Sequence, residues 1–220
     1  MVMICLFGGT FDPVHNGHLH AARTAAGFLG CPARLVLAAR PPHRPAPAAS
    51  AEDRWAMLRA ACAGMPELVP DDSEFRRPHP GYTVDTLERV RRRHPGKPVF
   101  WVVGMDAFRD LGTWHRWREV FDLAHLLLLN RPGAVLDQPA RAVYEELRLD
   151  ETPVSAAGGI LRLEAPMLDV SASAIRLSVA EGRPVPHLLP NGVEAYIRRN
   201  GLYAGDRAAT QPDDDSSPAG

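Results

Sequence analysis

The first eighteen residues constrain the fold of this chain more than any other stretch. An apolar run, residues 1–6, leads without a polar break into the sequence FGGTFDPVHNGH, residues 7–18. Uninterrupted apolar residues predict a buried strand over residues 2–7. Apolar positions then recur at helical spacing over residues 18–29, where Gly30 ends the pattern. A strand followed closely by a helix is the unit from which α/β folds are built.

The alternation of strand and helix continues along the chain. Further strands are predicted over residues 35–39, 99–103, 126–129 and 160–163. Further helices are predicted over residues 50–62, 85–93, 117–123, 173–180 and 193–199, with a short one near Phe108. This order predicts an α/β fold with a Rossmann-like open parallel sheet, helices on both faces, and a single domain. Ligands of such sheets bind outside the carboxyl ends of the strands, where Gly8, Gly104 and residues 130–133 are expected.

Composition argues against several classes of protein. The 220 residues carry a net charge of −1 at pH 7, so we expect no strong attraction to nucleic acid or to a membrane surface. No apolar run approaches the roughly 20 residues of a membrane span. No signal peptide is recognisable, and the three cysteines follow no metal-binding or disulfide-like spacing, which predicts a cytoplasmic location. Assembly into a homo-oligomer is left open.

The end of the chain differs from the rest. Residues 204–220 are acidic and poor in apolar side chains, so they are predicted to form a disordered tail. Residues 1–203 are then the folded domain.

The opening motif predicts a phosphate site. Glycines between a strand and a helix let main-chain N–H groups approach an anion, and the helix N-terminus adds a partial positive charge. Neither the dinucleotide-binding nor the P-loop pattern is present. His15 and His18, three residues apart, share one helix face, can donate to phosphate oxygens, and can carry charge near neutral pH. The alternative, that one histidine caps the helix and the other is buried, is less favoured after the sequence GGTFDP.

The sequence GGTFDPVHNGH resembles the signature of the nucleotidyltransferases that carry the H-x-G-H motif, and among them the bacterial nicotinate-nucleotide adenylyltransferases. The resemblance continues through PPHR at 41–44, YTVDTL at 82–87, VVGMDAF at 102–108, TWHRW at 113–117, NRPG at 130–133, VSASAIR at 170–176 and LLPNGVEAYIRRNGLY at 188–203. It covers residues 1–203 in order. One departure concerns the late motif, which usually reads I-S-S-T-x-I-R; here Ala172 has no hydroxyl.

The resemblance implies an ATP-dependent enzyme of NAD biosynthesis that transfers AMP from ATP to nicotinate mononucleotide and releases pyrophosphate. The catalytic residues that it implies are His15, His18 and Arg176. Those implied for ATP and its phosphates are Gly8, Gly9, Thr10, Phe11, His43, Arg44 and Ser173. Those implied for the mononucleotide are Thr83, Gly104, Asp106, Trp114 and His115. Mg²⁺ is expected on the substrate phosphates, without a protein ligand, because it prefers phosphate and water to an all-protein cage.

Several of these residues have a plainer interpretation. Trp114 is expected to stack on the pyridine ring, although it could be a core residue, a role better suited to Trp117. The Thr83 hydroxyl is expected near the nicotinate carboxylate, and N-capping is its alternative. Asp12 is interpreted as a turn-former that bonds its own backbone.

Two basic segments also have two interpretations. By resemblance, His43 and Arg44 form a lid over the triphosphate, and the alternative is a solvent-exposed basic loop in the proline-rich segment 40–50. The arginines between residues 89 and 93 are interpreted as a solvated helix end, where cations suit the helix dipole, and not as a nucleic-acid site.

Three rival functions compete with this one, and the second of them usually lacks the TWHRW and YTVDTL stretches that are present here. One is an adenylyltransferase that prefers nicotinamide mononucleotide, and another is the related enzyme acting on phosphopantetheine. The third is a nucleotide-binding module without catalysis, which would be expected to lack His15 or His18, yet both are present.

Overall fold

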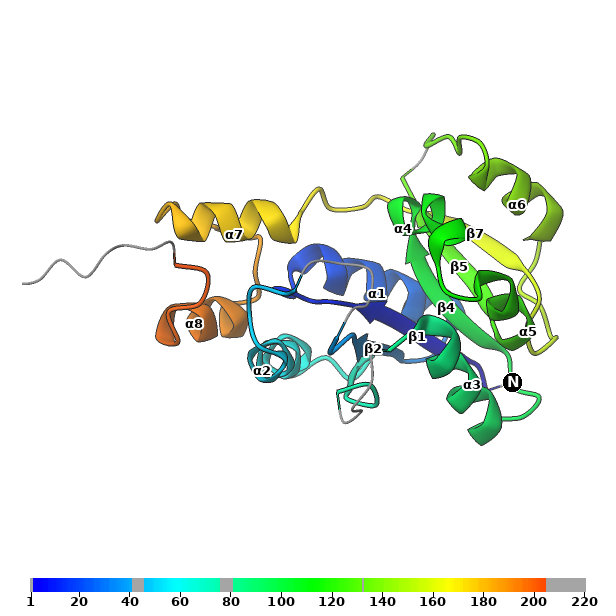
Figure 1. Ribbon diagram of the computed structural model, residues 1–220, viewed down its shortest axis with the longest axis horizontal. Helices are drawn as coiled ribbons and strands as arrows, with labels where there is room; N and C mark the ends of the chain where they lie inside the picture. Colours follow the sequence, from blue (N-terminus) through cyan, green and yellow to red (C-terminus); the bar gives the residue numbers. More distant parts are fainter. Residues whose placement is uncertain (1, 41–45, 76–80, 132, 205–220) are drawn as a thin grey trace, which may run out of the picture.

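The computed structural model describes residues 2–40, 46–75, 81–131 and 133–204. Across these residues seven strands form one sheet in the order β3-β2-β1-β4-β5-β7-β6, and all neighbours run parallel. The strands are β1 (Ile4–Gly9), β2 (Ala33–Leu37), β3 (Leu68–Asp71), β4 (Val99–Gly104), β5 (His125–Asn130), β6 (Arg148–Leu149) and β7 (Ile160–Glu164). The predicted open parallel sheet is confirmed (Figure 1).

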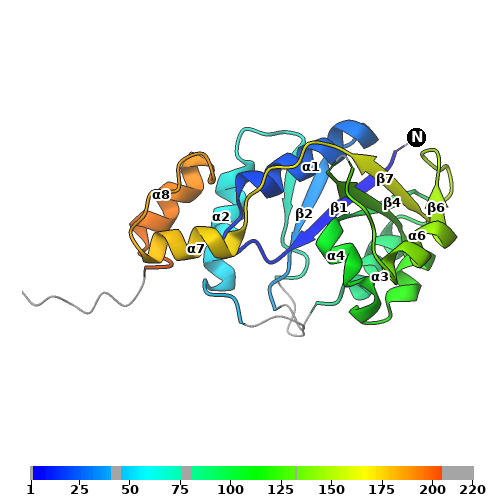
Figure 2. The ribbon, with the colours of Figure 1, turned by 90° about the horizontal axis from the view of Figure 1, so that it is seen from above.

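Helices connect the strands and cover both faces of the sheet. They are α1 (Asn16–Leu29), α2 (Ala51–Cys62), α3 (Thr83–Arg93), α4 (Met105–Arg109), α5 (Val120–Leu123), α6 (Ala140–Leu147), α7 (Ala172–Ala180) and α8 (Asn191–Arg199), with 3-10 turns η1 (Leu111–Thr113) and η2 (Trp117–Glu119). Helices α7 and α8 lie together at one end of the molecule and α6 lies at the other (Figures 1 and 2). Within the described ranges, no helix combines the length and the apolar character needed to cross a membrane.

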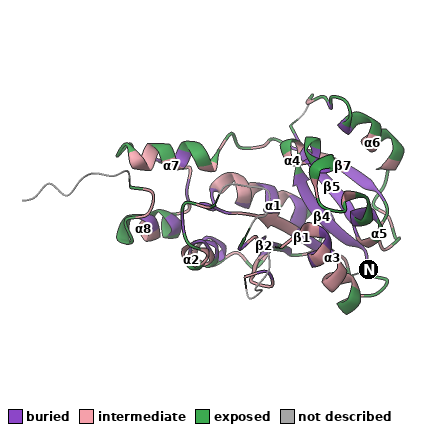
Figure 3. Ribbon diagram, viewed as in Figure 1, coloured by how far each residue is buried: buried purple, intermediate pink, exposed green. Residues whose placement is uncertain are grey.

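The central strands contribute to a hydrophobic core on each face, because successive side chains of a strand point in opposite directions. In β4, Phe100 and Val102 belong to one core cluster with residues of α1, α2, α7 and α8, whereas Trp101 and Val103 belong to another with residues of α3, α4 and α5. Figure 3 shows these strands buried between the helices. Burial on both faces explains why the sequence of a central strand is continuously apolar.

Some predicted boundaries are wrong by two or three residues. The predicted strand 2–7 is β1, which continues through both glycines to Gly9. The predicted strand 35–39 is β2, which begins at Ala33 and ends at Leu37. Helix α1 begins at Asn16 and not at residue 18, and α3 begins at Thr83 and not at residue 85. Ser50 is the N-cap of α2, where its Oγ accepts from the Asp53 main-chain N–H at 3.0 Å.

Elements that the sequence did not predict lie mainly at the edges of the sheet. Strands β3 and β6 are the two edge strands, and α6 leads into β6. β3 contains Pro70, which an edge strand tolerates because one side of its backbone has no strand partner. β6 has only two residues. Such short, weakly apolar segments have no readable periodicity.

The arginine-rich end of α3 is only in part a solvated helix end. Arg92 and Arg93 are exposed, as expected. The Arg91 guanidinium instead donates to the carbonyls of Lys97 and Ala156, both at 2.7 Å, and to that of Leu123. The interpretation is therefore wrong for Arg91, which joins α3 to two distant loops.

Candidate active site

A cavity of about 450 Å³ opens at the carboxyl ends of β1 and β4. The strand order reverses between these two strands, because β2 and β3 follow on one side and β5 on the other. Open α/β sheets bind ligands at this switch point, and the volume lies within the roughly 300–1,000 Å³ of small-molecule sites. Two groups of residues line the cavity. We call Gly8, Gly9, Thr10, Phe11 and His18 the β1 wall, and Tyr82, Thr83, Gly104, Trp114 and His115 the β4 wall.

The two histidines of the motif cap the helix that carries them. The main-chain N–H of His18 donates to His15 Nδ1, and that of His15 donates to His18 Nδ1, both at 3.3 Å. The rings stack with centroids 3.6 Å apart. Because each Nδ1 accepts, we assign the proton of each neutral ring to Nε2, which remains a donor. The reciprocal cap therefore sets the tautomer of both histidines.

His15 is neutral at physiological pH. Its residue is only 5% exposed, and burial lowers the pKa of His15 to about 4. The expectation that both histidines carry charge near neutral pH is thus wrong for His15. His18 lines the cavity, whereas His15 is buried and caps α1. The capping alternative therefore describes His15, whereas His18 lines the cavity.

The glycines are needed for side-chain packing, and the chain turns after them. A Cβ on Gly8 would overlap the Trp101 ring, and one on Gly9 would lie 2.7 Å from Phe11 Cε1. Both residues belong to β1, so the expected glycine turn is wrong. The turn occurs at Phe11, whose φ of +50° is left-handed and uncommon for a residue with a side chain. The Phe11 ring meets His18 edge-on, with centroids 5.1 Å apart.

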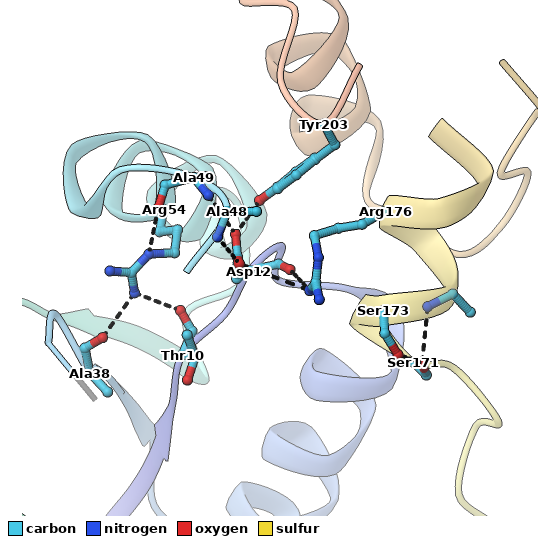
Figure 4. Close-up of polar contacts among 11 residues, drawn as sticks. Thr10, Asp12, Ala38, Ala48, Ala49, Arg54, Ser171, Ser173, Arg176 and Tyr203 are labelled. Atoms are coloured by element: carbon cyan, nitrogen blue, oxygen red, sulfur yellow. Dashed lines mark hydrogen bonds and ion pairs between the residues drawn. The ribbon is translucent and has the colours of Figure 1, made fainter. Parts of the chain in front are cut away.

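Arg176 lies beside the β1 wall and contacts the motif through Asp12. Its Nη1 donates to the Asp12 carbonyl oxygen at 2.6 Å and lies 3.9 Å from Asp12 Oδ2 (Figure 4). The Asp12 carboxylate accepts from the main-chain N–H groups of Ala48 and Ala49, at 2.7 and 3.1 Å, and from the Tyr203 hydroxyl at 2.7 Å. Asp12 does lie in a turn, as interpreted, but the expectation that its side chain bonds its own backbone is wrong.

The late motif places one small residue in the cavity. Ser171 is the N-cap of α7, where its Oγ accepts from the Ala174 N–H at 3.2 Å. Ser173 is exposed, with its Oγ 2.8 Å from Ser171 Oγ. Ala172 lines the cavity. The position that lacks the hydroxyl of the late motif is thus one that lines the cavity.

Arg54 is a buried cation that the sequence did not single out. It is 1% exposed and donates to the carbonyls of Thr10, Ala38 and Ala39 at 2.8–2.9 Å, and to that of Ala49 at 3.3 Å. These carbonyls lie just beyond β1 and β2 and just before α2, so one side chain joins three segments around the cavity. Arg54 lies at helical spacing from Met57, Leu58 and Ala61, and this pattern alone would have placed it on the buried face of α2.

The β4 wall brings together aromatic side chains from separate segments. Tyr82 and His115 face each other with ring centroids 4.3 Å apart. Trp114 is half-buried: it lines the cavity, and it also packs against the core, which was its alternative role. Trp117 packs against the same core, as expected, edge-on to Phe121 at 6.4 Å. Tyr82 holds the N-cap position of α3, so N-capping by Thr83 is wrong.

The acidic residues around the cavity differ from expectation. Gly104 lines the cavity, but the Asp106 side chain is 98% exposed, lies 3.3 Å from Arg109 Nη1, and takes no part in the lining. The acidic residues that do line it are Asp12, Glu74 and Asp110. The Glu74 carboxylate is buried and accepts from Thr86 Oγ1 at 2.5 Å.

Some expectations fall outside the residues that can be compared. His43 and Arg44, and nearly all of the acidic tail 204–220, lie outside the described residues. Within residues 2–40, 46–75, 81–131 and 133–204, no three His, Cys, Asp or Glu side chains are grouped so that they could hold a metal ion.

Comparison with known proteins identifies the relatives of this chain. The cytidylyltransferase-like family matches residues 6–178. A protein of Pseudomonas syringae pv. tomato named "Probable nicotinate-nucleotide adenylyltransferase" is 43% identical over 98% of this chain and 97% of its own. A protein of the same name from Aeromonas salmonicida is 40% identical over 92% of this chain and 98% of its own.

Solved structures with the same fold are more distant in sequence. Nicotinic acid mononucleotide adenylyltransferase of Plasmodium falciparum, complexed with NaAD, superimposes with a TM-score of 0.72 at 16% identity, covering 92% of this chain and 98% of that one. The same enzyme complexed with APC gives a TM-score of 0.69 at 16% identity, with the same coverage. At this identity the similarity establishes the fold.

Proposed function

The chain belongs to the cytidylyltransferase-like family and, within it, to the nicotinate-nucleotide adenylyltransferases, and on this premise we propose that it transfers AMP from ATP to nicotinate mononucleotide. The products are nicotinate adenine dinucleotide and pyrophosphate, in a step of NAD biosynthesis. The observation that carries this proposal is the cavity itself. It joins a wall with a phosphate-binding motif to a wall with aromatic rings, an arrangement suited to two nucleotides whose phosphates meet between the walls.

The reaction is a displacement at the α-phosphorus of ATP. A phosphate oxygen of the mononucleotide forms a bond to that phosphorus, the bond to the bridging oxygen of the β-phosphate breaks, and pyrophosphate leaves with its electron pair. The attacking group is already an anion, so no general base is required. Catalysis then consists of positioning the two phosphates and stabilising charge on them.

The β1 wall suits the reacting phosphates. His18 lines it, and the helix cap leaves its Nε2–H as the donor. The main-chain N–H groups of residues 9–11 add further donors, and the N-terminus of α1 adds a partial positive charge. His15 is buried, stacks on the His18 ring and so fixes the orientation of that ring. Arg176 and Ser173 then bind the departing pyrophosphate, for which the fixed donor geometry of arginine is well matched.

The β4 wall suits the nicotinate mononucleotide. The Trp114 ring lines the cavity and stacks on the flat pyridine ring. Thr83 is the first residue of α3, so its hydroxyl and the first N–H groups of that helix are donors for the nicotinate carboxylate. Gly104 and His115 complete this wall.

Mg²⁺ is carried by the substrate phosphates in this proposal. The described residues present only scattered carboxylates near the cavity, a donor set that fits water- and phosphate-bound magnesium better than a protein cage. When bound, the ion neutralises phosphate charge. We place the reaction in the cytoplasm, since Cys5, Cys31 and Cys62 are all free thiols.

The test is pyrophosphate release by the purified protein with ATP, Mg²⁺ and nicotinate mononucleotide. We expect release that depends on all three and that is lost in His18→Ala. Nicotinamide mononucleotide in a parallel reaction measures the preference between carboxylate and amide, and a faster rate with the amide would contradict the substrate assignment. No release above that of the variant would contradict catalysis altogether.

A further inference from the structure

The Asp12 carboxylate joins four parts of the chain that are far apart in sequence. Asp12 follows β1, Ala48 and Ala49 precede α2, Arg176 lies in α7, and Tyr203 follows α8. The residue is only 7% exposed. A carboxylate is buried at a cost unless donors compensate, and here two main-chain N–H groups, one hydroxyl and one guanidinium do so (Figure 4).

Tyr203 is held in an uncommon conformation to make its contact. Its φ is +60°, in the left-handed region that residues with side chains seldom adopt. Its hydroxyl donates to Asp12 Oδ1 at 2.7 Å. Burial, and then the hydrogen bond to the Asp12 carboxylate, raise the pKa of Tyr203, so the hydroxyl keeps its proton and remains a donor at neutral pH. The contact therefore adds a second donor to Oδ1, which also accepts from the Ala49 N–H, and so holds that oxygen in place.

Asp12 in turn determines where the Arg176 guanidinium lies. Arg176 Nη1 donates to the Asp12 carbonyl at 2.6 Å and is 3.9 Å from its carboxylate. Both acceptors belong to one residue, so a movement of Asp12 moves them together. The guanidinium has to meet a pyrophosphate whose place is set by the β1 wall, and Asp12 directly follows that wall.

We propose that Asp12 and Tyr203 are positioning residues, in which the Tyr203 hydroxyl fixes the Asp12 carboxylate and Asp12 holds Arg176 at the phosphate-binding wall of the cavity. The proposal rests on the proposed function, because it takes Arg176 as the ligand of pyrophosphate. It makes the last described residues of the chain part of the catalytic arrangement, although Tyr203 itself touches no reacting atom.

The chain offers a matched control in a second tyrosine–aspartate pair. Tyr196 lies in α8, and its hydroxyl donates to Asp53 Oδ1 in α2 at 2.9 Å. This contact also joins the end of the chain to its first quarter, but neither residue lines the cavity. Tyr196→Phe therefore removes the same kind of hydrogen bond without touching Asp12.

The first experiment compares Tyr203→Phe with Tyr196→Phe in the full chain. We expect Tyr203→Phe to lower kcat and to raise the inhibition constant of pyrophosphate, each about two- to tenfold, the size of one hydrogen bond. KM for nicotinate mononucleotide should not change. Tyr196→Phe should leave kcat and pyrophosphate inhibition as in the wild type, while both variants shift Tm by similar amounts. Equal kinetic effects of the two variants would overturn the proposal.

The second experiment is a double-mutant cycle of Asp12→Asn and Arg176→Ala. The amide turns one acceptor into a donor that opposes a main-chain N–H, so we expect a larger loss of kcat than in Tyr203→Phe. If Asp12 acts through Arg176, the double variant should be no more than about twofold slower than Arg176→Ala. Losses that multiply would overturn the proposal. If Asp12→Asn does not fold, the Tyr203→Phe comparison decides, and an inactive wild type would instead refute the proposed function.

Discussion

The two walls of the cavity are built in different ways. The β1 wall comes from one continuous stretch, residues 8–18, and its histidines are held by hydrogen bonds between residues three apart. The β4 wall comes from three separate segments, residues 82–83, 104 and 114–115, that meet through tertiary packing. Local bonds set the orientation of a side chain independently of the rest of the molecule, whereas the β4 wall depends on how α3, β4 and η1 pack.

Because they are built differently, the two walls are expected to affect different kinetic constants. In the proposed function, the β1 wall presents N–H donors to charged phosphates, where stabilisation is expected mainly in the transition state. The β4 wall would present rings to a flat heterocycle, which should be bound equally in the ground and transition states. Changes in the first wall should therefore affect kcat, and changes in the second should affect KM.

Removing Mg²⁺ should have the largest effect and should act on one wall only. With excess EDTA we expect pyrophosphate release to fall to background. Binding of nicotinate mononucleotide, measured by the quenching of tryptophan fluorescence, should persist. The Tm of the ligand-free protein should not change. A fall in Tm on chelation would contradict the proposal that the protein itself holds no ion.

His18→Ala should lower kcat by about 10²–10³, the typical cost of losing one donor to transition-state charge. KM for nicotinate mononucleotide should stay within about twofold. His20→Ala is the matched control, because His20 lies in the same helix but outside the cavity, with its Nε2 2.6 Å from the Pro166 carbonyl oxygen. Steady-state kinetics at saturating ATP distinguish the two variants. A change confined to KM would contradict the expectation that the β1 wall affects kcat and the β4 wall affects KM.

Trp114→Ala should raise KM for nicotinate mononucleotide by about tenfold or more, since stacking of a base on an aromatic side chain contributes about 1–3 kcal/mol. We expect kcat to remain within about twofold, and Trp114→Phe to restore most of the affinity. Trp117→Ala removes a ring outside the cavity, so it should lower Tm without this change in KM. If Trp114→Ala reduced kcat as strongly as it raised KM, the two walls would not act separately.

The smallest predicted effect is the dependence of stability on pH. The pKa of His15 is lowered to about 4 in the folded protein, from an ordinary value of 6.5, so below pH 6.5 the unfolded chain takes up a proton that the folded chain does not. Stability should therefore fall as pH falls, by about 1 kcal/mol between pH 7.5 and 5.5.

His15→Asn tests this effect, since asparagine is a good N-cap residue without a titrating ring. Urea unfolding at the two pH values should show a smaller loss for the variant than for the wild type. An equal loss would mean that the proton uptake belongs to another group.

The elements predicted with the right type are those with strong local patterns. β4 and β5 are continuous apolar runs, and α1 has apolar positions at helical spacing, so each could be recognised without its neighbours. The edge strands β3 and β6 were missed because an edge strand buries too little to need such a pattern. Site residues inside motifs were found for the same reason: Gly104, Trp114 and His18 all line the cavity.

The sequence by itself determined the parallel α/β sheet, a helix at the histidine pair, and the edge of the sheet at which a ligand is expected, because all three follow from local periodicity and the alternation of strand and helix. Only the tertiary structure decided that His15 is neutral, that Asp106 turns outward, and that Arg54, Asp12 and Tyr203 join distant segments. Burial and contacts between remote residues are properties of the packed molecule, and no short stretch of sequence contains them.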